Sequence, residues 1–133
     1  EKDALESYGK NLGLAFQIAD DTLDYYSTQK NFGKEIGKDF FEGKATLPLI
    51  IIFQRATSEE RIFLKEIFKK EKRNEDDFSE TLALINKYKA VQASFKRAEY
   101  FVNVSYEALE IFKDSEEKNI LQNLTEFSLN RSF

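Results

Sequence analysis

Three aspartates interrupt an otherwise apolar helical pattern near the start of the chain, and this combination restricts the fold more than any other feature. The pattern runs from residue 4 to about residue 28 and predicts one long helix. At about 100° per residue, one sector of roughly 60° holds Gly13, Gln17, Asp20 and Asp24, with Asp21 at the edge of another face. Apolar residues cover most of the remaining circumference, so we expect a buried central helix.

Buried carboxylates require a compensating positive charge, because an unpaired charge inside a protein is costly. Oxygen ligands favour Mg²⁺, which takes one or two carboxylates and completes its shell with waters and substrate phosphates. Residues 30–43 then hold three of the five glycines, which indicates positive φ angles and close backbone approach. Lysines alternate with these glycines, and ammonium groups neutralise phosphate. The sequence predicts a Mg²⁺-diphosphate site, and the alternative is a solvated acidic face followed by a flexible basic loop.

The remaining sequence predicts further helices and no strands. Thr46 to Pro48 is typical of a helix start, and Thr57 with Glu60 predicts a cap for a helix reaching about Lys70. We expect that helix to bury Ile62, Phe63, Ile67 and Phe68 and to end in a solvated basic segment of Lys65, Lys69, Lys70, Lys72 and Arg73. We interpret residues 74–79 as a turn whose Asp76 and Asp77 cap a helix rather than bind metal.

The C-terminal half completes the prediction of an all-α fold. A short helix carries Leu82, Ile85 and Tyr88, and a longer one runs from about residue 91 to 112. The longer helix has one apolar face, which holds Val91, Phe95, Ala98, Val102, Ser105 and Leu109. Residues 114–117 break the pattern, and a last helix leads toward Arg131.

Composition excludes several function classes. The chain has 133 residues, enough for one domain with a real core, and a net charge of −4 that gives no reason to expect nucleic acid. It contains no cysteine and no histidine, which excludes disulfides, thiolate metal sites and imidazole chemistry. No run of apolar residues is long enough for a transmembrane helix, and we expect a soluble, cytoplasmic chain.

Three linked motifs resemble the second aspartate-rich region of trans-isoprenyl (polyprenyl) diphosphate synthases. They are Phe16-Gln17-x-x-Asp20-Asp21-x-x-Asp24, Gly33-Lys34-x-x-Gly37-x-Asp39 and Gly43-Lys44-x-Thr46-Leu47-Pro48, which stand in family order and at family spacing. The resemblance implies an isoprenoid-synthase-type helical bundle. Residues 1–133 would then form the C-terminal part of a single synthase domain, whose first aspartate motif lies upstream of this chain.

The resemblance also implies an activity and roles for individual residues. Family members couple an allylic diphosphate to isopentenyl diphosphate with Mg²⁺, and they are usually homodimers. Asp20 would be the first direct ligand of Mg²⁺, and Asp21 and Asp24 would bind it directly or through coordinated water. Contacts to the allylic diphosphate would come from Lys34 and Lys44. Residues near the reacting chain would be Phe16, Gln17 and Thr46, while Asp39 would fix a lysine. Lys38 has no assigned role in the family, and we interpret it as a solvated lysine.

The missing upstream motif leaves other functions open. We expect this chain alone to have little or no activity, and its product length cannot be derived from these residues. One alternative is a non-catalytic, regulatory subunit of a heteromeric synthase, although such subunits often lose the aspartates that are present here. A second is a helical interaction domain with a solvated acidic face. Class I terpene cyclases also use Mg²⁺ and aspartates, but the two glycine-lysine motifs favour prenyl elongation.

Overall fold

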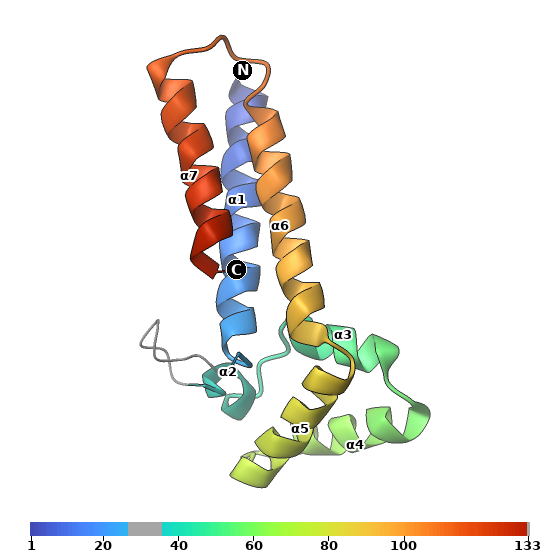
Figure 1. The fold of residues 1–133 in the computed structure, drawn as a ribbon. Helices are drawn as coiled ribbons and strands as arrows, with labels where there is room; N and C mark the ends of the chain where they lie inside the picture. The colour runs from blue at the N-terminus through green and yellow to red at the C-terminus, as the bar shows by residue number, and fades with distance from the viewer. Residues whose placement is uncertain (27–35, 133) are drawn as a thin grey trace. The chain divides into compact units, whose positions relative to one another are not determined.

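The chain folds into α-helices, as the sequence predicts. The computed structural model describes residues 1–26 and 36–132, with side chains as far as residue 126. Within these residues there is no β-strand, and the helices are α1 (Lys2–Leu23), α2 (Lys38–Phe41), α3 (Leu47–Arg55), α4 (Ser58–Lys69), α5 (Glu75–Lys87), α6 (Ala90–Ala108) and α7 (Glu116–Ser132) (Figure 1). None of the described helices combines the length and the apolar character needed to cross a membrane.

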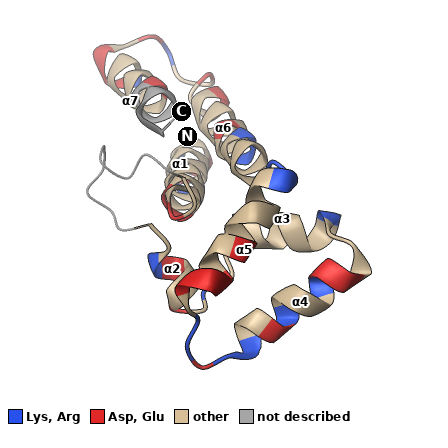
Figure 2. Cartoon of the chain, turned by 60° about the horizontal axis from the view of Figure 1, so that its bottom comes forward, with Lys and Arg blue, Asp and Glu red and all other residues tan. Residues whose placement is uncertain are grey.

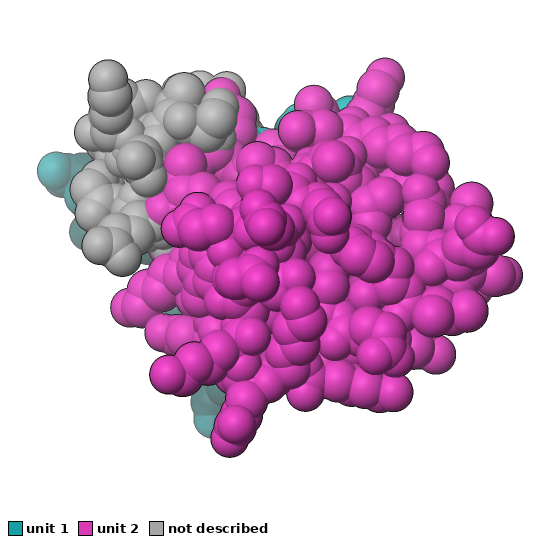
Figure 3. All heavy atoms as spheres, turned by 90° about the horizontal axis from the view of Figure 1, so that it is seen from below, with its two compact units in different colours: residues 1–19, 95–133 teal, residues 20–94 magenta. Residues whose placement is uncertain are grey.

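The helices divide into two compact units, coloured separately in Figure 3. Unit 1 comprises Glu1–Ala19 and Phe95–Phe133, and unit 2 comprises Asp20–Ser94. Both α1 and α6 therefore begin in one unit and end in the other. The three aspartates of the predicted site all belong to unit 2.

Unit 1 packs α1, α6 and α7 side by side, with α6 running opposite to the other two (Figure 1). Its core is built by Tyr8, Leu12, Ala15, Ala98, Val102 and Leu109. The Tyr8 hydroxyl donates to the Leu121 carbonyl at 3.0 Å, and Ser105 Oγ donates to the Tyr8 carbonyl at 3.1 Å. Burial raises the pKa of Tyr8. The apolar face predicted for residues 91–112 is confirmed at Ala98, Val102 and Leu109.

The prediction that α1 is a buried central helix is only partly confirmed among the described residues. Leu12 and Ala15 are buried, but Leu14 is 40% exposed and Gln17 is also exposed. The helix is amphipathic, because the described helices of unit 1 cover only one of its faces.

Unit 2 is built around an aromatic cluster. Phe40 is completely buried, and its ring lies 5.3 to 5.4 Å from the ring centroids of Phe41, Phe68 and Phe78. The aliphatic side chains buried in this unit include Ile52 from α3, Ile67 from α4 and Ile85 from α5. Because α2 contributes Phe40, this four-residue helix is anchored in the core of the unit.

Local capping signals fix the starts of these helices. Thr46 is the N-cap of α3 with Pro48 in its first turn, and Thr57 with Glu60 forms a capping box on α4, both as predicted. Asn74 and Asp77 form a second box, so the capping interpretation of Asp77 is confirmed, although α5 begins at Glu75 instead of after a turn over 74–79.

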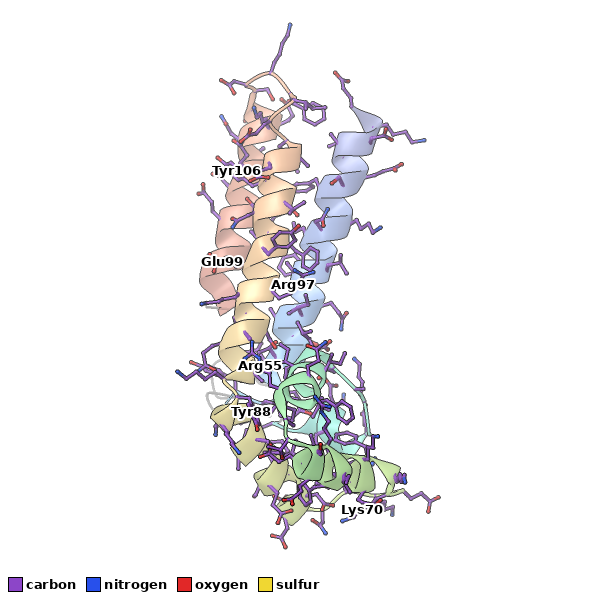
Figure 4. The ribbon with its side chains drawn as sticks, turned by 90° about the vertical axis from the view of Figure 1, so that its right-hand side faces the viewer. Arg55, Lys70, Tyr88, Arg97, Glu99 and Tyr106 are labelled. Atoms are coloured by element: carbon purple, nitrogen blue, oxygen red, sulfur yellow. The ribbon has the colours of Figure 1, made fainter. Side chains whose placement is uncertain are left out.

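Charged residues lie at the ends of α4 and α5 where they interact favourably with the helix dipoles. Acidic residues gather in the first turn of α5, and basic residues lie at the end of α4 (Figure 2). The predicted apolar stripe of α4 is partly wrong, because Ile62 is 61% exposed whereas Leu64 is buried. The basic end of α4 is not simply solvated either, since Lys70 Nζ pairs with Asp77 Oδ1 at 2.8 Å. Lys70 lies at this end of α4 in Figure 4.

Glu60 links α4 to the end of α5 in unit 2. Its carboxylate accepts from the Thr57 amide at 2.8 Å, from Lys87 Nζ at 2.7 Å and from the Tyr88 hydroxyl. Arg55 at the end of α3 donates to the Tyr88 carbonyl at 2.7 Å (Figure 4). The bonds from Lys87, Tyr88 and Thr57 lower the pKa of Glu60 to about 2.

This pKa predicts an acid-sensitive contribution to stability. The folded pKa of about 2 lies below the ordinary value of 4.5, so the contribution of Glu60 is complete above pH 4.5 and is lost as the pH falls toward 2. In urea unfolding, Glu60→Gln should lower the midpoint at pH 6, and its difference from wild type should shrink toward pH 2. Glu59→Gln, on the same turn but exposed, serves as the control. A difference that does not change with pH would contradict the assignment.

Candidate metal and diphosphate site

The aspartate helix ends one residue before Asp24. The sequence predicts helix as far as about residue 28, but α1 ends at Leu23 and continues as a turn, in which the amides of Tyr25 and Tyr26 donate to Thr22 and Leu23. The prediction that Asp24 shares one helical face with Asp20 is therefore wrong, because Asp24 lies beyond the end of the helix. Its side chain leaves the helix because it binds the start of α2.

Asp24 binds the first turn of α2, whose N-cap residue is Gly37. Its carboxylate is completely buried and accepts from the amides of Asp39 at 3.0 Å and Phe40 at 3.2 Å. The Asp24 carbonyl also accepts from the Gly37 amide at 2.9 Å. Gly37 has φ +86°, and a Cβ there would lie 3.0 Å from the rings of Phe41 and Phe78. Only glycine therefore fits where the chain enters α2.

The basic loop returns to the aspartates through Lys44. Lys44 Nζ lies 3.5 Å from Asp21 Oδ1, and the Lys44 amide donates to the Asp39 carbonyl at 2.9 Å. The Asp21 side chain is 12% exposed and that of Lys44 is 50% exposed. The carboxylates of Asp21 and then Asp39 raise the pKa of Lys44, so its ammonium group stays charged at neutral pH. The structure thus brings together one predicted carboxylate and one predicted lysine.

Several other predicted residues lie around this pair. Asp20 is exposed in the last turns of α1, Asp39 and Thr46 are buried, and Lys38 is exposed as expected. Positive φ angles are confirmed at Gly37 and Gly43. The predicted positions that lie outside the described residues are Gly33 and Lys34.

Phe16 and Gln17 precede the aspartates on α1 and belong to unit 1. Phe16 is half-buried and Gln17 is exposed. Their roles near a reacting chain stay predictions.

Tyr25 is a site residue that the helical pattern missed. Its side chain is only 3% exposed, and burial, followed by the carboxylates of Asp24 and Asp39, raises its pKa. The hydroxyls of Tyr25 and Thr46 are both buried, and neither makes a well-formed hydrogen bond with the described residues. The turn after α1 stacks the Tyr25 ring on Phe78 of α5, with the ring centroids 6.1 Å apart.

The donor set fits a divalent cation that also binds phosphate. Among the described residues, no three acidic side chains form a ready-made metal site. Asp20 and Asp21 nevertheless supply two carboxylates, which is the number that Mg²⁺ takes when substrate phosphates and waters complete its shell. Asp24 differs from them, because both of its oxygens accept backbone amides.

Comparison with known proteins now places this arrangement in a family. The sequence profile of the polyprenyl synthetase family matches residues 1–85, most of the chain and all of the site just described. The chain belongs to the polyprenyl synthetase family. The resemblance inferred from the three motifs is confirmed, and so is the fold class, because solved members of the family share this arrangement of helices.

Relatives of this polyprenyl synthetase chain match it along its whole length. It is 32% identical over 133 residues to octaprenyl diphosphate synthase of Haemophilus influenzae and 34% identical over 128 residues to a short chain isoprenyl diphosphate synthase of Methanothermobacter thermautotrophicus. The matches include 100% and 96% of this chain, respectively, but only 40% and 39% of the lengths of the two relatives.

A solved relative is the polyprenyl synthase of Caulobacter crescentus in complex with calcium and isoprenyl diphosphate, with a TM-score of 0.86 and 37% identity. The match covers 98% of this chain and 40% of that one. The chain therefore spans about two-fifths of the length of these relatives.

Proposed function

We propose that this chain is the C-terminal, second-aspartate-motif part of a Mg²⁺-dependent prenyltransferase that joins an allylic diphosphate to isopentenyl diphosphate. The observation that carries the proposal is the ion pair between Lys44 and Asp21, 3.5 Å long, at the end of the aspartate helix. It places a cation suited to diphosphate next to carboxylates suited to a divalent metal. Membership of the polyprenyl synthetase family supports the same reaction class.

Each residue of the site has a separate task in this proposal. Asp20 and Asp21 hold Mg²⁺, which when bound supplies positive charge against the departing diphosphate. Lys44 adds a second positive charge. Its pairing with Asp21 is half exposed and screened by water, so Lys44 can exchange this carboxylate for a phosphate oxygen at small cost. Asp24 holds α2 and thereby the loop that carries Lys44.

The test uses the complete protein that contains this chain, with radiolabelled isopentenyl diphosphate, an allylic primer and Mg²⁺. We expect a Mg²⁺-dependent polyprenyl product whose rate of formation, as kcat/KM, falls by about 100-fold or more in Asp20→Asn and in Lys44→Ala. Lys38→Ala removes the same charge from an exposed position on α2 and should stay within about twofold of wild type. The size of the product would supply the chain length.

Two other outcomes would replace the proposal. If wild type elongates no primer but stimulates a catalytic partner, the chain belongs to a regulatory subunit. If wild type elongates no primer and shows no Mg²⁺-dependent pyrophosphate binding, the acidic face is merely solvated and the chain is a helical interaction domain.

A further inference from the structure

Arg73 ties the end of α2 to the end of α4. It lies between α4 and α5, and its guanidinium donates to carbonyl oxygens of both helix ends, namely Phe40 at 2.9 Å, Phe41 at 3.3 Å, Lys70 at 2.8 Å and Ile67 at 3.5 Å. Carbonyls at the end of a helix have no partner within the helix, and a cation there is favourable. Arg73 also lies over the Phe68 ring, 5.5 Å from its centroid. The sequence pattern, which treats Arg73 as solvated, is wrong at this position.

The guanidinium also touches the backbone immediately before Lys44. A Cβ added to Gly43 would lie 2.7 Å from Arg73 Nη2. Gly43 has φ +77°, and its amide donates to the Phe40 carbonyl at 2.9 Å, the same oxygen that accepts from Arg73 Nε. Arg73 and Gly43 therefore share one acceptor and pack directly against each other.

The position of Lys44 depends on this backbone. Its side chain is half exposed and its ion pair with Asp21 is 3.5 Å long, which is too weak an interaction to hold a flexible lysine by itself. The backbone of residues 40–44 directs Lys44 toward Asp21. This backbone is fixed by α2 and by the hydrogen bond that the Lys44 amide donates to the Asp39 carbonyl. Asp24 holds the first end of α2, and Arg73 holds the second.

We propose that Arg73 is a positioning residue, whose guanidinium fixes Gly43 and the end of α2 so that Lys44 is presented to Asp21 and to a bound diphosphate. The second half of this inference rests on the proposed function. Lysine cannot take over the task, because one ammonium group cannot donate to several carbonyls in a planar fork. The structure supplies a matched comparison in Arg61, which donates to the Phe53 and Gln54 carbonyls at the end of α3 and lies over the Phe53 ring.

The first measurement does not depend on diphosphate. In the complete protein, a carbodiimide can join the Lys44 amine to the Asp21 carboxylate as an amide, and mass spectrometry gives the yield. We expect Arg73→Lys to lower this yield about fivefold or more and Arg61→Lys to leave it within about twofold. Gly43→Ala, which displaces the guanidinium from the other side, should reproduce the loss and serves if Arg73→Lys does not fold. Equal yields in the Arg73 and Arg61 variants would overturn the inference.

The second measurement is binding of Mg²⁺-pyrophosphate by calorimetry. We expect Arg73→Lys to weaken binding about tenfold, and to have no further effect in a Lys44→Met background. An equal loss in that background would show that Arg73 does not act through Lys44 and would overturn the positioning role. If the cross-link yield falls as expected but wild type binds no Mg²⁺-pyrophosphate, the link between Arg73 and Lys44 stands and the proposed function fails.

Discussion

Replacing Asp24 by asparagine should destabilise unit 2 by about 2–3 kcal/mol, because a buried carboxylate that accepts two backbone amides cannot be replaced by an amide group without loss. Asparagine keeps one acceptor oxygen, while its NH₂ group faces an N–H donor of α2. Asp24 is completely buried, so water cannot satisfy the abandoned donor. We expect the amides of Asp39 and Phe40, which it now holds at 3.0 and 3.2 Å, to lose protection from hydrogen exchange.

The control for this experiment is Asp20→Asn, a substitution of the first aspartate of the motif. Asp20 is exposed on α1, so Asp20→Asn should change the free energy of unfolding by no more than about 0.5 kcal/mol while removing a proposed Mg²⁺ ligand. Urea denaturation and hydrogen exchange of both variants separate the two roles. If Asp24→Asn is as stable as Asp20→Asn and keeps the protection of the Asp39 and Phe40 amides, the capping role of Asp24 is wrong.

This contrast divides the aspartate motif into two kinds of residue. Asp20 is exposed and Asp21 pairs with the half-exposed Lys44, whereas both oxygens of Asp24 are used to hold α2. A loss of activity in an Asp24 variant would therefore not identify Asp24 as a metal ligand. Only a variant whose stability is unchanged can do so.

The features that the sequence predicts correctly depend on neighbours a few residues apart. The start of α3 at Thr46, the capping box of Thr57 and Glu60, and the buried face of α6 all arise within one or two helical turns. Such signals lie in the spacing of neighbouring residues, so they can be read from the residue order alone.

The features that the sequence misses depend on contacts between distant residues. Asp24 leaves the helical pattern because it binds amides 15 and 16 residues later, and Arg73 is held by a carbonyl 33 residues earlier. Neither partner belongs to a periodic pattern, and α2 is too short to produce one. The resemblance to a family predicts the chemistry of the site, whereas the contacts that hold α2 and Lys44 in place are visible only in the structure.

Phe40→Ala should have the largest effect on stability, a loss of about 3–5 kcal/mol, because a completely buried ring is removed from the centre of unit 2. Three rings surround Phe40 in edge-to-face contacts at interplanar angles of 61° to 87°. Phe40→Leu fills most of the volume and should cost about 1–2 kcal/mol, chiefly through the lost aromatic pairs. Urea unfolding of Phe40→Leu measures the cost of the lost aromatic pairs, and urea unfolding of Phe40→Ala measures the cost of removing the whole ring.

Phe63→Ala is the matched control, since it removes the same side chain from a position that is 36% exposed and should cost less than half as much. The Phe40 substitution should also affect the site, because the Phe40 ring anchors α2, and α2 carries the main-chain carbonyl to which Arg73 and Gly43 donate. We therefore expect the cross-link between Lys44 and Asp21 to fall in Phe40→Ala and to persist in Phe63→Ala. Equal costs at Phe40 and Phe63 would mean that the aromatic cluster is not closed in solution, and α2 would then lack the anchor on which the geometry of Lys44 depends.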